Sequence, residues 1–172
     1  MVIKNALAAV LGLAVLTACT ATPESAPTTG DSAPPTTTST TQAAVAGIDC
    51  AKAPADVVGA ALQLNLKHPR QEIDGKLVTC HYDGGGAMTS VRFATGADAA
   101  SFAKGKEGFG SGGQRAKDLP GFFDEAYTGS LGTGEVLVNT LAARKGPLEV
   151  VVTSGANFEQ EKKLVTALFE RV

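Results

Sequence analysis

The side chains of this sequence that could do chemistry are few: three cysteines, two histidines and one serine set among glycines. Ser111 lies in the stretch Gly-Phe-Gly-Ser-Gly-Gly, but a serine nucleophile needs a histidine base within reach, and the usual Gly-x-Ser-x-Gly turn is missing. His68 and His81 have no dense group of acidic residues beside them, so the sequence does not indicate a metal site. We therefore expect no catalytic residue, no metal and no cofactor.

The N-terminus has the pattern of an export signal. Lys4 is followed by an apolar run from Ala6 to Leu16, which has the length of a signal-peptide core and is shorter than the roughly 20 residues that span a bilayer. The small pair Thr17-Ala18 then precedes Cys19, as small residues precede a cleavage site. The sequence predicts a signal peptide over residues 1–18.

The stretch Leu16-Thr17-Ala18-Cys19 resembles the lipobox of bacterial lipoproteins. The resemblance implies that Cys19 is diacylated on sulfur and becomes the first residue of the mature chain. Two acyl chains, each contributing about 0.8 kcal/mol per buried CH₂, hold a protein on a membrane without spanning it. We therefore expect a lipid anchor at the extracytoplasmic face of the cell membrane. The alternative is an ordinary secretory signal with an accidental cysteine.

Cys50 and Cys80 are the two cysteines that remain once Cys19 carries lipid. In an oxidising compartment such a pair is expected to form a disulfide. Closing a loop of about 30 residues stabilises a fold by roughly 3 to 4 kcal/mol in the chain-entropy account. A redox or metal pair would need Cys-x-x-Cys spacing or further ligands, and the sequence has neither.

Composition divides the rest of the chain into a tether and one domain. Residues 19–46 contain the lipidated cysteine and a disordered stretch rich in Thr and Pro, which favours extended conformations and is typical of O-glycosylated segments. Residues 47–172 suffice for a single globular domain. The chain has 15 Lys and Arg against 17 Asp and Glu, with no long run of one sign, so we expect no nucleic-acid partner.

Apolar periodicity in 47–172 predicts three helices and several strands. The expected helices run from about Pro54 to Leu66, from Asp98 until the glycines at Gly105, and to the C-terminus after caps among residues 154–157. The expected strands are 71–82 with a bend at 74–75, 87–93, 135–144 and 148–153. This pattern predicts an α+β domain in which helices pack on one face of an antiparallel sheet of about five to six strands, with a single disulfide. The element order also hints at an internal duplication.

Three phenylalanines are the candidate contacts for a ligand or partner. Gly105 to Gly113 is predicted as a loop, and Phe109 within it either folds back onto the core or is a contact residue. Phe122 and Phe123 belong to the densest aromatic cluster, which we expect in the core. A cavity between helices and sheet would be lined by residues such as Phe122, Phe123, Val138 and Leu164.

From Cys50 onward the chain also resembles small lipoproteins of actinobacterial cell envelopes, which are mostly of unassigned function. The shared features are the lipobox, the Thr/Pro tether, a cysteine that opens the domain, and Cys80 in a Val-x-Cys-x-Tyr strand. The resemblance implies an envelope protein with one disulfide and transfers no catalytic residue.

We therefore expect a membrane-anchored, non-enzymatic binding or interaction module of the cell envelope, with an envelope protein or an apolar ligand as partner. One alternative is a carrier of a small apolar or lipid ligand in an internal cavity. A second is a small hydrolase built on Ser111 and a histidine. The sequence does not indicate the oligomeric state.

Overall fold

The computed structural model describes residues 47–172 apart from 112–113 and 133–136. Its helices are the 3₁₀-helix η1 (Cys50–Lys52), α1 (Ala55–Leu62), α2 (Ala99–Ser111) and α3 (Phe158–Phe169). Its strands are β1 (Arg70–Asp74), β2 (Leu77–Tyr82), β3 (Thr89–Thr95), β4 (Lys117–Asp118), β5 (Glu125–Leu131), β6 (Val138–Lys145) and β7 (Leu148–Ser154). The predicted signal peptide, lipobox and tether lie outside the described residues. No helix within the described part of the chain is long and apolar enough to cross a membrane.

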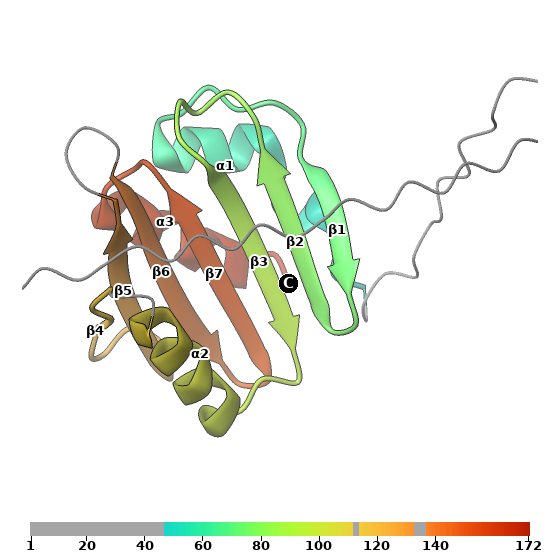
Figure 1. Ribbon diagram of the computed structural model, residues 1–172. Coiled ribbons are helices and arrows are strands. Elements are labelled where there is room, and N and C mark those ends of the chain that lie inside the picture. Colours follow the sequence, from blue (N-terminus) through green and yellow to red (C-terminus); the bar gives the residue numbers. More distant parts are fainter. Residues whose placement is uncertain (1–46, 112–113, 133–136) are drawn as a thin grey trace, which may run out of the picture. The chain divides into compact units, whose positions relative to one another are not determined.

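The strands form one antiparallel sheet in the order β1-β2-β3-β7-β6-β5-β4 (Figure 1). The predicted α+β class with an antiparallel sheet is therefore confirmed, but the sheet has seven strands, more than the five to six expected. The bend at Asp74-Gly75 is a turn that separates β1 from β2. The aromatic segment assigned only to the core contains the strand β5.

The helices cover both faces of the sheet, so the prediction that they pack on one face is wrong for α2. Helices α1 and α3 lie on one face, and α2 lies on the other (Figure 1). Side chains of β6 and β7 alternate between the two layers. Those that face α1 and α3 include Leu141, Ala143, Val150 and Val152, and those that face α2 include Ala142 and Val151.

Helix α1 ends at Leu62, four residues earlier than predicted, because the chain turns back on Gly59. Gln63 adopts the left-handed conformation with φ 58°, and the Leu64 N–H donates to the Gly59 carbonyl at 2.9 Å. A Cβ on Gly59 would lie 2.6 Å from the Leu64 oxygen. Glycine is therefore required for this close approach.

Helix α2 continues through the glycines that were expected to end it, so the prediction of a loop from Gly105 is wrong for residues 105–111. Asp98 and Ser101 exchange hydrogen bonds at its start, where the Ser101 N–H donates to Asp98 Oδ1 at 2.7 Å and the Asp98 N–H donates to Ser101 Oγ at 2.9 Å. The rings of Phe102 and Phe109 then attach the helix to the sheet. Tertiary contacts and a cap thus override the poor helix propensity of glycine.

The internal duplication suggested by the element order is not supported by the layers. The helices α2 and α3 follow β3 and β7, which are antiparallel neighbours. A two-fold axis that relates such a pair is perpendicular to the sheet and would place both helices on the same face. They lie on opposite faces.

The segment from β6 to α3 follows the prediction closely. The β6–β7 hairpin turns at Gly146, which has φ 57°, and α3 begins after Asn157. Asn157 and Gln160 form a reciprocal capping box.

One acidic side chain, Glu161, is fully buried on the inner side of α3. Its Oε1 accepts a hydrogen bond of 2.7 Å from the Ser154 hydroxyl, whereas its Oε2 has no partner among the described residues. Burial raises the pKa of Glu161 to about 8, against a smaller lowering by the Ser154 bond. The carboxyl is therefore protonated at neutral pH.

We predict that Glu161 makes the domain less stable as the pH rises from about 5 to 8. Its pKa is about 8 when folded and 4.5 ordinarily, so the folded state holds the extra proton across this window. Because the folded state binds more protons, the free energy of unfolding falls with pH, by up to about 1.4 kcal/mol per pH unit. Urea unfolding at pH 5 and pH 7.5 should show that Glu161→Gln removes this loss. Equal pH dependence in the two proteins would contradict the prediction.

Candidate functional site

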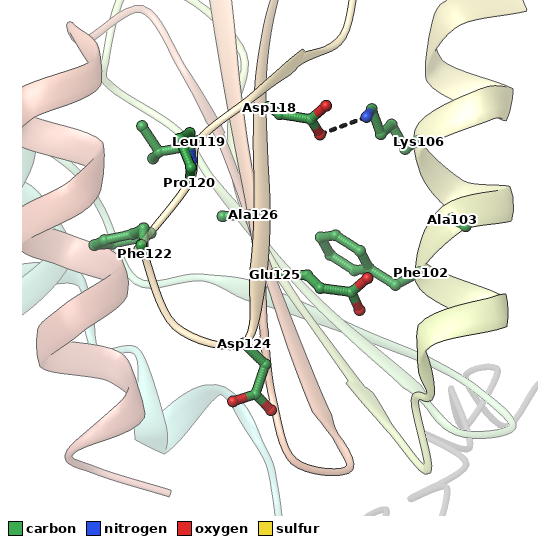
Figure 2. A pocket seen from close by; sticks show the side chains of 11 residues that line it. Phe102, Ala103, Lys106, Asp118, Leu119, Pro120, Phe122, Asp124, Glu125 and Ala126 are labelled. Carbon is green, nitrogen blue, oxygen red and sulfur yellow. Dashed lines mark hydrogen bonds and ion pairs between the residues drawn. The ribbon is translucent and has the colours of Figure 1, made fainter.

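A surface pocket of about 290 Å³ lies at the β4–β5 edge of the sheet. Figure 2 shows Phe102, Ala103 and Lys106 on α2 at one side, and the segment between β4 and β5 at the other. The end of β4, this segment and the start of β5 contribute Asp118, Leu119, Pro120, Gly121, Phe122, Asp124, Glu125 and Ala126. The volume is at the lower end of the roughly 300 to 1,000 Å³ of typical ligand pockets, so the pocket fits a side chain or a small ligand.

Two aromatic rings hold α2 on the sheet, and one of them, Phe102, also lines the pocket. Phe102 is buried, with its ring centroid 5.4 Å from that of Tyr127 on β5, and Phe109 lies 5.9 Å from the same ring. Phe109 covers Gly129, where an added Cβ would lie 2.1 Å from the ring. The absence of a side chain at Gly129 is therefore what lets Phe109 reach the sheet.

The opposite wall has a strained backbone. Phe123 has φ 58°, in the left-handed region that costs a residue other than glycine about 1 to 3 kcal/mol. Its ring lies 4.4 Å from Phe169 on α3 and 4.7 Å, edge to face, from Phe122. Contacts with the α3 layer thus hold Phe123, while Phe122 remains half-buried at the pocket wall.

Backbone hydrogen bonds fix both ends of this segment. The Leu119 N–H donates to the Ala126 carbonyl at 2.9 Å, and the Asp124 N–H donates to the Arg144 carbonyl at 3.0 Å. The Asp124 carboxylate also accepts from the Gly146 N–H at 2.7 Å. Hydrogen bonds therefore hold both ends of the segment between β4 and β5 in place.

The rim carries three carboxylates that share two cations. Lys106 on α2 pairs with Asp118 across the pocket (Figure 2). Arg144 donates from Nε to Glu125 Oε2 at 2.8 Å and lies 3.5 Å from Asp124 Oδ2 through Nη1. Each carboxylate has one oxygen in these contacts and a second with no hydrogen bond to the described residues.

A second groove, of about 270 Å³, lies on the other side of α2. Arg92 Nη2 pairs there with Glu149 Oε1 at 2.8 Å, beside Leu77 and Ala94. Burial, and then the Glu149 charge, raise the pKa of the neighbouring Tyr127. Because its two charged residues pair with each other, this groove is the weaker candidate.

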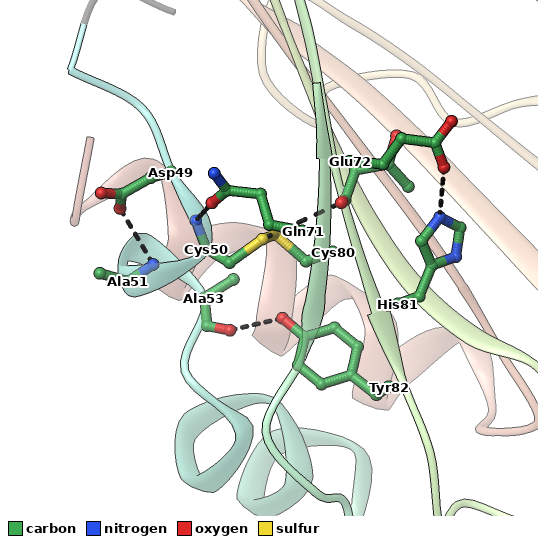
Figure 3. Close-up of a disulfide and its surroundings, with 10 residues drawn as sticks. Asp49, Cys50, Ala51, Ala53, Gln71, Glu72, Cys80, His81 and Tyr82 are labelled. Atoms are coloured by element: carbon green, nitrogen blue, oxygen red, sulfur yellow. Dashed lines mark hydrogen bonds and ion pairs between the residues drawn. A yellow bond between two sulfur atoms is a disulfide. The ribbon is translucent and has the colours of Figure 1, made fainter. Parts of the chain in front are cut away.

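The predicted disulfide is confirmed. It joins Cys50 and Cys80 with a Cα–Cα distance of 5.7 Å (Figure 3). The Cys50 N–H donates to Gln71 Oε1 at 2.7 Å, and the Tyr82 hydroxyl donates to the Ala53 carbonyl. Burial raises the pKa of Tyr82. These contacts fasten the start of the domain to β1 and β2, which is a structural role.

The serine and the histidines considered for hydrolysis are separated. Ser111 ends α2 near β5 and donates to the Gly108 carbonyl at 2.8 Å. His81 lies on β2 and contacts Glu72 at 3.2 Å. Strands β2 and β5 are four strand spacings apart, or about 19 Å. His68 precedes β1, at the far edge of the sheet, so neither histidine can act as a base for Ser111 in this arrangement.

The three phenylalanines proposed as contacts have different positions. Phe122 lines the pocket, whereas Phe109 packs on Tyr127 and Phe123 on Phe169. Leu164, expected to line an internal cavity with them, is fully buried and shares a packed cluster with Phe122 and Phe123. These residues therefore fill the layer between sheet and α3.

The charged residues of the pocket were missed by sequence reasoning. Lys106 follows the glycine that was expected to end the helix, and neither Asp118 nor Glu125 was a candidate site residue. An alternative reading of 99–111 as a helix would have placed Ala103 and Lys106 on the same side as Phe102. Nothing in the sequence pairs that side with Asp118.

Comparison of the chain with protein-family models, with curated proteins and with solved structures gives no match. Within the described residues, no group of three or more His, Cys, Asp or Glu side chains is arranged to hold a metal ion.

We predict opposite effects for alanine at two glycines near α2. At Gly108 an added Cβ meets nothing within 4 Å, so Gly108→Ala should stabilise the domain by about 0.5 to 1 kcal/mol and slow amide exchange in α2. At Gly129 the Cβ would overlap the Phe109 ring, so Gly129→Ala should cost about 1 to 3 kcal/mol. Urea unfolding measures both.

Phe109→Ala provides the control, because it removes the ring that Gly129 accommodates. In that background Gly129→Ala should cost clearly less than in the wild type. Additive effects of the two substitutions would mean that Phe109 does not pack on Gly129.

Proposed function

We propose that this protein is a lipid-anchored, extracytoplasmic binding module of the cell envelope, and that its partner occupies the pocket between α2 and Asp118–Ala126. The lipobox pattern that ends at Cys19 and the Thr/Pro-rich tether support the anchor. The pocket supports the binding role, since it combines an apolar floor with a charged rim.

The observation that carries the binding role is the conformation of the pocket wall. Strained residues persist where surrounding structure holds them, and they gather at ligand-binding sites. Phe123 is such a residue, and it lies between two wall residues, Phe122 and Asp124. Both ends of the wall are hydrogen-bonded, so the site is formed before a partner arrives.

The rival role, a carrier of an apolar or lipid ligand, receives less support. The residues suggested for its cavity are packed together, with Leu164 fully buried. The pocket beside α2, at 290 Å³, suits a small group better than a long chain. We therefore favour recognition of a partner over carriage.

Substitution of the lipobox cysteine tests the anchor. Cys19→Ala should yield protein that carries no acyl chains and no longer enters the detergent phase in Triton X-114 partitioning, because the two chains supply the membrane affinity. Membrane fractionation of wild type and variant measures this. Identical partitioning of the two proteins would refute the lipid anchor.

Site-specific photocrosslinking tests the pocket. Ala103 is exposed on α2 and lines the pocket, so a photoreactive p-benzoylphenylalanine at this position should give a discrete adduct with an envelope component in intact cells. Ala60, an exposed alanine on α1, is the matched control and should give no such adduct. Adducts of equal yield from both positions, or none from Ala103, would count against this site.

A further inference from the structure

The pocket between α2 and Asp118–Ala126 has an apolar interior and a rim rich in hydrogen-bond acceptors. Its uncharged lining is aromatic, aliphatic or prolyl, apart from one glycine, and consists of Phe102, Ala103, Leu119, Pro120, Gly121, Phe122 and Ala126. Its charged lining is one amine and three carboxylates, namely Lys106, Asp118, Asp124 and Glu125. An occupant that matches both parts has an apolar body and a polar end.

The rim favours a positive end. Its carboxylates are neutralised by Lys106 and Arg144, two cations for three anions. The oxygens Asp118 Oδ2, Asp124 Oδ1 and Glu125 Oε1 have no hydrogen bond to described residues and can only accept while ionised. Lys145, next to Arg144 in the sequence, lies 5.9 Å from the Phe123 ring centroid and does not line the pocket.

The exposure of the rim fits a charge that stays hydrated. The side chains of Asp118, Asp124 and Glu125 are 73%, 49% and 38% exposed. Lysine and arginine bury their methylene stems against apolar surface and keep the charged end in water. The apolar floor of the pocket therefore suits the methylene stem of such a side chain, and the hydrated acidic rim suits its charged end.

We propose that the pocket binds the side chain of a lysine or arginine presented by a partner protein, with the stem against the apolar lining and the cation at the acidic rim. This inference rests on the proposed function and specifies the chemistry of the partner. The small volume of the pocket agrees with a single side chain.

Three small probes test the proposal by separating stem from charge. n-Butylammonium reproduces the lysine side chain, 1-butanol has the stem without the charge, and ammonium chloride has the charge without the stem. In ¹H–¹⁵N spectra of the isotope-labelled protein at constant ionic strength, butylammonium should give saturable shifts at the amides of Phe102, Ala103 and Ala126. Butanol should bind several-fold more weakly, and ammonium chloride should give no saturable shift.

Two variants test whether butylammonium binds at the acidic rim of the pocket. Asp118→Asn should weaken butylammonium by up to about fivefold and leave butanol unchanged, since an exposed ion pair is worth little. Asp74→Asn, at an exposed carboxylate on the opposite edge strand β1, is the matched control and should change neither affinity.

The outcomes distinguish this inference from the proposed function. Equal affinity for butanol and butylammonium, or no butylammonium binding alongside a crosslink from Ala103, would overturn the preference for a basic side chain while the binding site remains. Butylammonium shifts confined to residues outside the pocket would overturn it as well. Selective, saturable butylammonium binding that Asp118→Asn weakens would support it.

Discussion

The domain depends on the burial of β6 and β7 from both sides. Leu141 and Val152 face the layer of α1 and α3, while Ala142 and Val151 face α2. Each of these four side chains is at most 9% exposed, so neither face of the central strands can be left uncovered without loss of hydrophobic burial. The position of α2, and therefore one wall of the candidate pocket, follows from this requirement.

Sequence reasoning succeeded where local signals and long-range packing agree. The apolar run in 148–153 predicted a strand, which is the central strand β7, and the caps among residues 154–157 predicted the start of α3. The predicted strand in 71–82 contains β2, on which Val78 and Cys80 both face the core. In these segments the spacing of apolar residues alone predicts the element, because it matches the period of the helix or strand that forms.

Sequence reasoning failed where a contact between distant segments decides the outcome. The glycines of α2 indicate a helix end by propensity, yet Phe109 lies over Gly129 of β5 and the helix continues. The two-residue strand β4 has no period-based signal. The candidate pocket was predictable only in part for the same reason: Phe122 was singled out, whereas the pairing of Lys106 with Asp118 needs the three-dimensional arrangement.

The Cys50–Cys80 disulfide also determines how the domain would bear mechanical load. Cys50 lies three residues after Gly47, so a pull on the chain from its N-terminal side reaches β2 through a covalent bond almost at once. The intervening residues 51–79, which include α1 and β1, cannot be drawn out while the bond is intact. Force is delivered instead to β2, which is hydrogen-bonded to strands on both sides. A domain under a pulling force at its N-terminal side would therefore resist stepwise unfolding from that end.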